Sequence, residues 1–288
     1  MLALGRPETG QNRQLGRFEA AVGTRAPNCP ADGMAEKKFF DEFRGPPTAL
    51  NRAGFRGNGT LGLVDTCPED VREMIVIGIV GSPAGGKSTV ARRLQDLGAT
   101  WINADEIARS VLEQEEVQAE LLHHFGSKIA GNDGRIDRSK LAAEVFGDDD
   151  SKRRALTYLE SLIHPRTRRI ISARLIEAHR QGCGVAILDV PLLFKSGWDR
   201  CCDEIWCVDA DRTLRLQRAE ARGWHPRELS DREANQLDIN EKKRLSNLVI
   251  MNNGSLSQLH ETIERRWRSL TDRHKVLVPD PHCYDREV

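Results

Sequence analysis

The amino-acid sequence predicts an α/β fold, a three-layer αβα sandwich with a parallel five-stranded sheet. Two observations support this prediction. Short apolar runs alternate with longer amphipathic stretches from residue 74 onward, and the first run, IVIGIV, is apolar throughout, which is typical of strands buried on both faces. The runs that we assign to strands lie at residues 75–80, 99–103, 184–190, 204–210 and 247–252.

The predicted helices occupy the stretches between and after these strands. One covers about 86–97 and another about 255–272, where apolar residues recur at helical intervals. A long helix-rich stretch separates the second strand from the third and is broken by glycine, asparagine and aspartate at 131–134. Because this stretch cannot lie within the layers of the sandwich, we expect about 113–180 to project as a helical cap near the active edge.

The region before the first strand differs in composition from the rest. Residues 1–73 are rich in glycine, proline, asparagine and charge, without helical or alternating periodicity, so we expect a disordered extension. An organelle transit peptide is an alternative, because arginines occur near the start of this region. Translation from Met34 or Met74 is another alternative. We therefore expect one folded domain over 74–273 and a polar tail over 274–288.

Charge and cysteine content limit the classes of partner. The 288 residues include 43 Lys plus Arg and 43 Asp plus Glu, so there is no net basic field to attract nucleic acid or anionic lipid. The seven cysteines form no CxxC pair, which favours reduced thiols in the cytoplasm. No apolar run approaches the roughly 20 residues that cross a bilayer. We expect a soluble monomer or weak homo-oligomer that acts on a small molecule.

The clearest motif is GSPAGGKS at residues 81–88. It fits GxxxxGK[ST] between a buried strand and a helix, which is the pattern of a P-loop. Its glycines let backbone N–H groups converge on phosphate oxygens, Lys87 brings charge to the outer phosphates, and Ser88 offers its hydroxyl to Mg²⁺. The sequence thus predicts a P-loop NTPase fold, with a nucleoside triphosphate held by Ala84, Gly85, Gly86, Lys87, Ser88 and Thr89.

An aspartate follows the second strand. In doubly wound sheets, ligands bind beyond the carboxyl ends of the strands. Asp105 comes eighteen positions after Lys87 and so returns to the rim that carries the P-loop. Its carboxylate is placed to accept the proton of an attacking hydroxyl. Aspartate also suits the N-cap of the next helix, and position alone leaves the two roles open.

A second aspartate ends the third strand. Asp189 follows an apolar run, as in a Walker B segment, so its carboxylate is placed to hold Mg²⁺ directly or through water. The alternative is a turn aspartate before Pro191. We keep both roles, with the metal role as the main prediction.

Arginines follow the fourth strand. Arg215, Arg218 and Arg222 recur at spacings of three and four, so we expect them to share one helical face. Such a face, in a lid over about 215–240, would close over the triphosphate and exclude water. An ordinary solvated helix is the alternative.

Taken in order, the motifs resemble those of dephospho-CoA kinases. They are GSPAGGKST, INADEIAR, HFGSKIAGNDGRIDRSKLAAEVFGDDDSKRRALTYLESLIHP, DVPLLFKSG, RAEARG and LVIMNNGSL. The similarity covers about 74–273. The P-loop is shared by many families, whereas the other segments together are far more specific.

The resemblance implies an activity and its catalytic residues. The γ-phosphate of ATP would be transferred, with Mg²⁺, to the ribose 3′-hydroxyl of dephospho-CoA. Asp105 matches the family's catalytic base, which favours that role over the cap. Lys87 and Arg218 would also act in catalysis, and Arg222 would bind ATP as a second lid arginine.

The resemblance also implies a site for the acceptor. His164, in the pair His-Pro, matches the family's acceptor-binding position in the helical cap, and Arg109 at the end of INADEIAR would contact the same molecule. Without the resemblance, His164 would be assigned to the start of a helix.

Four positions depart from the family pattern. Asn103 and Lys195 stand where Asp and Glu are frequent, and Asn247 and Met251 replace common acids. The change at Asn103 leaves Asp105 as the only carboxylate of a usual pair. The other three concern contacts with acceptor or adenine.

Other functional classes are alternatives. A nucleoside or nucleoside-monophosphate kinase would share the sheet and the lid. A GTP-dependent switch is disfavoured because VDADRT, not an NKxD-like segment, follows the fourth strand. A nucleic-acid motor or an ATP-binding module is disfavoured by the balanced charge.

Overall fold

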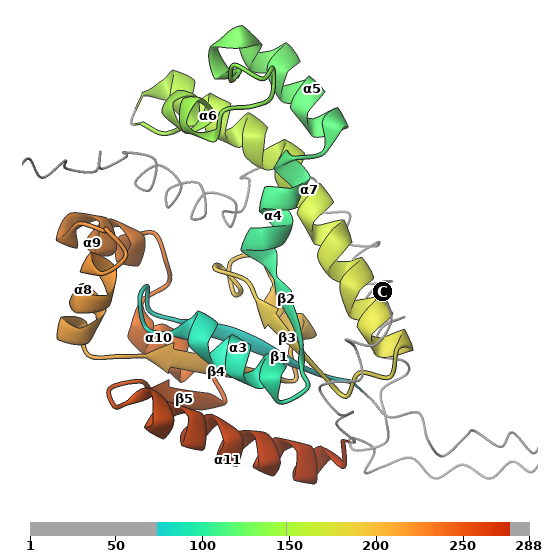
Figure 1. Ribbon diagram of the computed structural model, residues 1–288, viewed down its shortest axis with the longest axis vertical. Coiled ribbons are helices and arrows are strands. Elements are labelled where there is room, and N and C mark those ends of the chain that lie inside the picture. Colours follow the sequence, from blue (N-terminus) through green and yellow to red (C-terminus); the bar gives the residue numbers. More distant parts are fainter. Residues whose placement is uncertain (1–73, 148, 277–288) are drawn as a thin grey trace, which may run out of the picture.

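The computed structural model describes residues 74–147 and 149–276, so the predictions for 1–73 and 277–288 lie outside the described residues. It contains a parallel five-stranded sheet with the order β2-β3-β1-β4-β5 (Figure 1). The strands are β1 (Ile75–Gly81), β2 (Thr100–Asn103), β3 (Val185–Asp189), β4 (Glu204–Asp209) and β5 (Leu248–Met251). All five coincide with the predicted runs to within a residue or two, and the predicted sheet is confirmed.

Helices follow the strands in the predicted alternation. They are α3 (Lys87–Asp96), α4 (Ala104–Leu112), α5 (Glu115–Phe125), α6 (Arg138–Val145), α7 (Asp150–Arg180), α8 (Arg212–Glu220), α9 (Pro226–Ala234), α10 (Ile239–Arg244) and α11 (Leu256–His274). Two short 3₁₀ helices, η2 (Gly126–Ile129) and η3 (Trp198–Cys201), complete the described chain.

Helices cover both faces of the sheet, which confirms the three-layer sandwich. Side chains of β1 alternate between the two faces. Ile77 packs in a core with Leu94 of α3 and Ile263 of α11. Val76 points the other way and belongs to a core that includes Ile107 of α4 and residues of α7. The P-loop, which follows β1, is therefore held by the most buried strand of the fold.

The strand register brings three carboxyl ends to one rim. Asp189, at the end of β3, lies opposite Ile79 of β1 and opposite Asn103 at the end of β2. On the other side of β1, Gly81 lies opposite Val208 of β4. Because the P-loop follows β1 and Asp105 follows β2, both emerge at the rim that Asp189 occupies.

The insertion between β2 and β3 leaves the sandwich. Helices α5 and α6 and the first half of α7 form an arm that extends away from the sheet (Figure 1). α7 has 31 residues and returns the chain from this arm to β3. The arm is broken between η2 and α6, where Ala130 and Ile136 form an isolated antiparallel bridge. On the other side of the P-loop, α8 and α9 form a helical hairpin that leads into α10 (Figure 1).

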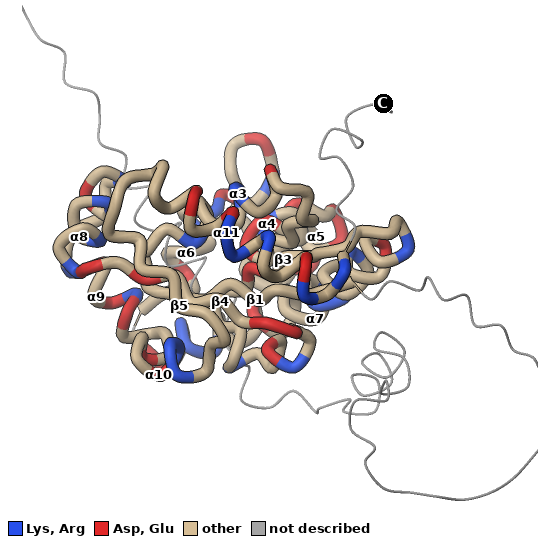
Figure 2. Tube along the Cα trace, turned by 90° about the horizontal axis from the view of Figure 1, so that it is seen from below, with Lys and Arg blue, Asp and Glu red and all other residues tan. Residues whose placement is uncertain are grey.

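Charge is spread over the described elements. Lys and Arg are interspersed with Asp and Glu along helices and loops (Figure 2), in keeping with the balanced totals of the sequence. None of the helices between residues 74 and 276 combines the length and apolar character needed to span a membrane. Among the described residues, Cys183, Cys201, Cys202 and Cys207 form no disulfide with one another.

Candidate active site

The P-loop has the backbone conformation of a phosphate cradle. Gly86 lies at φ +107°, a conformation that L side chains rarely adopt, and a Cβ there would collide with Asn252 Nδ2. The Asn252 amide donates to Gly85 O at 2.9 Å and so fixes the loop from the end of β5. α3 begins directly after Gly86, so its N-terminal N–H groups and partial positive charge face the loop.

Lys87 lies inside the loop. Its ammonium donates to Gly81 O at 3.4 Å and Ser82 O at 3.2 Å. Burial lowers the pKa of Lys87, while the negative charges of Asp189 and Asp105 oppose that shift. The lysine therefore stands between the loop and the two aspartates that the sequence singles out. Its neighbour Ser88 is exposed in the first turn of α3.

Asp105 lies in the first turn of α4, and its role as N-cap is not the one observed. Asn103 caps the helix, because its Oδ1 accepts from the N–H groups of Asp105 at 3.0 Å and Glu106 at 3.3 Å. The cap alternative for Asp105 is therefore wrong. The residue that departs from the family pattern, Asn103, has a local structural task, since an amide oxygen caps a helix as well as a carboxylate does.

The environment of Asp105 suits a base that works near neutral pH. Burial is the main cause that raises its pKa to about 7, and the charge of Asp189 adds to the shift. Lys87 and Arg232 act in the opposite direction. Asp105 is half-buried, so it is recessed but still accessible from solvent. A carboxyl group with a pKa near the operating pH is well matched to general base catalysis.

Asp189 and Ser88 provide oxygen ligands of the kind that Mg²⁺ prefers. Burial raises the pKa of Asp189, and the positive charge of Lys87 opposes the shift. The described residues contain no group of three or more His, Cys, Asp and Glu side chains that could hold a metal. One carboxylate and one hydroxyl would leave most positions around an Mg²⁺ ion to phosphates and water, which are its usual ligands.

The lid arginines do not share one helical face, which corrects the prediction. α8 ends at Glu220, so Arg222 lies in the following turn. Arg215 is 8% exposed. It forms ion pairs with Glu233 of α9 and, at 3.8 Å, with Asp209. Spacing alone cannot reveal these partners, because they come from distant parts of the chain.

Arg218 is at the P-loop. Its guanidinium donates to Asn252 O at 2.9 Å and more weakly to Gly85 O at 3.4 Å. Arg222 is exposed, and its charge acts on Lys87. Both arginines are thus on the nucleotide side of the sheet.

A further lid arginine was missed by the sequence reasoning. The Arg232 guanidinium of α9 lies 3.9 Å above the Trp224 ring and pairs with Glu228 at 3.2 Å. Its charge acts on Asp105, so it lies nearer to Asp105 than the sequence indicates. Arg222 lies 5.8 Å from the same ring. Arg232 lies in α9, a separate helix, so the regular spacing of Arg215, Arg218 and Arg222 does not extend to it.

The cap residues occupy two packed helices. Arg109 lies one helical turn beyond Asp105 in α4, on the same face. His164 is half-buried in the middle of α7, so the alternative that it starts a helix is wrong. Helices α4 and α7 pack against each other, which places both residues on the elements that join the cap to the sheet.

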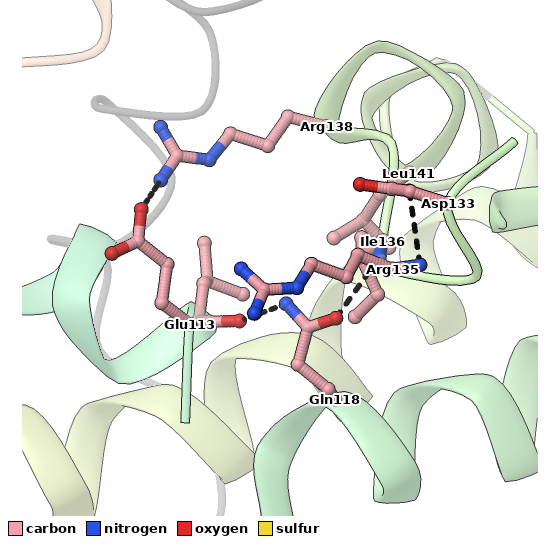
Figure 3. Close-up of a pocket in the computed structure, with 8 residues that line it drawn as sticks. Glu113, Gln118, Asp133, Arg135, Ile136, Arg138 and Leu141 are labelled. Atoms are coloured by element: carbon pink, nitrogen blue, oxygen red, sulfur yellow. Dashed lines mark hydrogen bonds and ion pairs between the residues drawn. The ribbon is translucent and has the colours of Figure 1, made fainter. Parts of the chain in front are cut away.

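A cavity of about 320 Å³ lies where α4 meets the arm (Figure 3). Arg138 pairs with Glu113 at 2.6 Å across it, and Gln118 bridges Leu112 O and the N–H of Ile136. The other residues that line it are Asp133, Arg135 and Leu141. Burial lowers the pKa of Arg109, and the charge of Arg138, which lines the cavity, lowers it further.

The remaining departures from the family pattern have local explanations or none. Asn247 accepts from the Ile205 N–H at 2.8 Å, so it ties β4 to the start of β5. Lys195 donates weakly to Asn235 O, at 3.4 Å, near the end of the lid. Met251 is 48% exposed, and nothing in the structure explains its presence.

Comparisons with known proteins address the family. A family model described as dephospho-CoA kinase matches residues 75–258. The dephospho-CoA kinase of Rhodopirellula baltica is 42% identical over 195 residues, which cover 68% of this chain and 90% of that protein. The chain belongs to the dephospho-CoA kinase family. The prediction of this family, and with it of an ATP-dependent kinase, is confirmed.

Further relatives agree in sequence and in fold. The dephospho-CoA kinase of Deinococcus radiodurans is 40% identical over 195 residues, or 67% of this chain and 91% of that protein. A crystal structure of a Thermus thermophilus protein, 34% identical, has a TM-score of 0.59 and covers 69% of this chain and 98% of its own. The dephospho-CoA kinase from Campylobacter jejuni, at 24% identity and a TM-score of 0.54, supports the fold.

Proposed function

We propose that the chain transfers the γ-phosphate of ATP to the ribose 3′-hydroxyl of dephospho-CoA and so forms coenzyme A. One observation carries the proposal within this family. Asp105, with its pKa raised to about 7, follows β2 at the rim where the P-loop follows β1, and its charge interacts with that of Lys87. A proton acceptor and a phosphate cradle thus lie side by side.

The donor side binds and orients ATP. The backbone N–H groups of the P-loop and of the α3 N-terminus hold the phosphates, and Lys87 turns from the loop carbonyls to the outer phosphates. Ala84, Gly85, Gly86 and Thr89 belong to this cradle in our proposal. Ser88 and Asp189 would hold Mg²⁺, which when bound supplies positive charge that neutralises the phosphates.

The acceptor side removes one proton. The Asp105 carboxylate accepts the proton of the 3′-hydroxyl. The hydroxyl oxygen forms a bond to the γ-phosphorus, and the bond between that phosphorus and the β-phosphate oxygen breaks. Arg109 and His164 would position the acceptor. We place the part of the acceptor that extends from the ribose along α4, towards the cavity beside Glu113.

The lid supplies charge and excludes water. Arg218 and Arg222 would act on the phosphates, because both lie on the P-loop side of the hairpin. We also propose action in the cytoplasm, because the seven cysteines form no CxxC pair or regular disulfide framework in the sequence.

A coupled assay of ADP release tests the proposal. The acceptors are dephospho-CoA, adenosine and AMP, each in a separate reaction with ATP and Mg²⁺. We expect dephospho-CoA to exceed the others in kcat/KM by orders of magnitude, with the product phosphorylated at the 3′ position by NMR. Equal rates with all three, or the same rate without acceptor, would contradict it.

A further inference from the structure

Lys242 reaches the P-loop from outside the motif. It belongs to α10 and is 4% exposed. Its ammonium donates to Gly81 O at 3.0 Å and to Gln236 Oε1 at 2.6 Å. Gln236 lies between α9 and α10, where the lid hairpin ends. One side chain therefore joins the first residue of the P-loop to the end of the lid.

Gly81 O is shared by two lysines. Lys87 donates to the same oxygen, at 3.4 Å, and a carbonyl oxygen can accept two hydrogen bonds. When a triphosphate binds, Lys87 has to turn towards the phosphates and release this oxygen. A buried carbonyl that loses its donors costs free energy. Lys242 is then the side-chain donor that remains bonded to Gly81 O.

The position of Lys242 is fixed by its helix. Asp238 caps α10 at its N-terminus. The next residue, Lys243, pairs with Asp209 at 2.7 Å, and Asp209 in turn accepts from Ser82 Oγ at 2.5 Å. Two consecutive lysines of α10 thus hold two consecutive residues of the P-loop, one directly and one through Asp209.

The positive charge of Lys242 also favours binding of an anionic nucleotide. Burial lowers its pKa to about 7, and the charge of Lys87 adds to this shift, while Cys207, Asp209 and Asp238 oppose it. Both of its hydrogen-bond partners are neutral oxygens. A buried ammonium group in this setting is stabilised further when an anionic triphosphate arrives.

We propose that Lys242 is a positioning residue for nucleotide binding. It holds the Gly81 carbonyl in place when Lys87 turns to the phosphates, and through Gln236 it ties the end of the lid to the P-loop. The inference rests on the proposed function only for the identity of the nucleotide.

The variants Lys242→Met, Lys242→Arg and, as a control, Lys275→Met, at an exposed lysine beyond α11, test this role. Titration calorimetry with a non-hydrolysable ATP analogue gives the Kd without any acceptor, and steady-state assays give KM for both substrates. For Lys242→Met we expect Kd and the KM for ATP to rise roughly tenfold or more, because a charged hydrogen bond is lost. The KM for dephospho-CoA should stay within about twofold. Lys242→Arg should recover most of the loss.

Two results would overturn the proposal. One is unchanged nucleotide affinity in a folded Lys242→Met protein, even when the thermal stability of that protein is lower. The other is an equal rise in KM for both substrates. If Lys242→Met does not fold, Gln236→Leu replaces it, since this variant keeps the lysine and removes only its lid partner. We expect a smaller rise in the Kd of the ATP analogue, and no rise would contradict the link to the lid. A failed acceptor assay with a normal Kd response would count against the proposed function alone.

Discussion

Asp189 and Asp209 occupy equivalent places and have opposite surroundings. Each ends a strand that flanks β1. Burial acts to raise the pKa of Asp209, but hydrogen bonds from Lys243 and Ser82 outweigh it and hold the pKa below its usual range. Burial raises the pKa of Asp189, and the opposing charge of Lys87, whose ammonium is hydrogen-bonded to loop carbonyls, does not outweigh it.

The difference shows when a carboxylate at a strand end is available for chemistry. Fixed cations of the fold already satisfy Asp209, so it serves the structure of the P-loop. Asp189 and its neighbour Asp105 carry raised pKa values, which is the usual sign of a functional carboxyl group. Two strand ends that look alike in sequence thus have different surroundings, and we propose a structural side at Asp209 and a catalytic side at Asp189.

The catalytic side is tested most strongly by Asp105→Asn. The amide keeps the shape of the side chain but cannot accept a proton from the hydroxyl. We expect kcat to fall about 10²- to 10⁴-fold, the range attributed to general base catalysis. The Kd for an ATP analogue, measured by calorimetry, should remain within a few-fold of that of the unaltered protein. Turnover at the normal rate would rule out Asp105 as the base.

The two strand-end aspartates should respond in opposite ways to the same substitution. Asp209→Asn leaves Lys243 and Arg215 without their shared charge, so we expect a loss of about 3–5 kcal/mol in the free energy of unfolding. Asp189→Asn should not destabilise the protein at neutral pH, because it removes a buried carboxylate whose pKa is raised on folding. It should instead raise the Mg²⁺ concentration needed for half-maximal activity, roughly tenfold.

Urea unfolding and Mg²⁺ titrations of the two variants make the comparison. If Asp189→Asn were the less stable protein, or if Asp209→Asn alone changed the Mg²⁺ requirement, the division into two sides would be wrong.

The sequence could predict the features that local pattern controls. The strands, the P-loop and the return of Asp105 to the rim follow from apolar runs, glycine geometry and the length of one helix. The sequence could not distinguish the roles of Asp189 and Asp209, because both residues end apolar strands. The cationic partners of Asp209 come from α8 and α10. Nor could the sequence place Arg215, whose partner Glu233 belongs to α9.

The raised pKa of Asp105 predicts a pH-dependent difference in stability. The folded-state pKa of about 7 exceeds the unfolded value of 3.8, so the folded state binds more protons between these values. The contribution of Asp105 to stability is therefore fully present below about pH 3.8 and lost as the pH rises through 7. The free energy of unfolding of Asp105→Asn, measured in urea, should match that of the unaltered protein near pH 4 and exceed it at pH 8 by up to a few kcal/mol. A constant difference across this range would contradict the raised pKa.

Asn103 gives the smallest effect and the sharpest view of the rim. Asn103→Ala removes the cap of α4, so we expect a loss of about 1 kcal/mol in the free energy of unfolding. Asn103→Asp keeps the cap and nearly the full stability, but it adds a negative charge two residues from Asp105 and should raise the pKa of that carboxyl further. The acid limb of the kcat/KM profile should then shift to higher pH in Asn103→Asp, whereas in Asn103→Ala it should stay close to its original position. Unfolding in urea and pH–rate profiles measure the two effects separately. An unshifted acid limb in Asn103→Asp would mean that Asp105 does not titrate in the catalytic step.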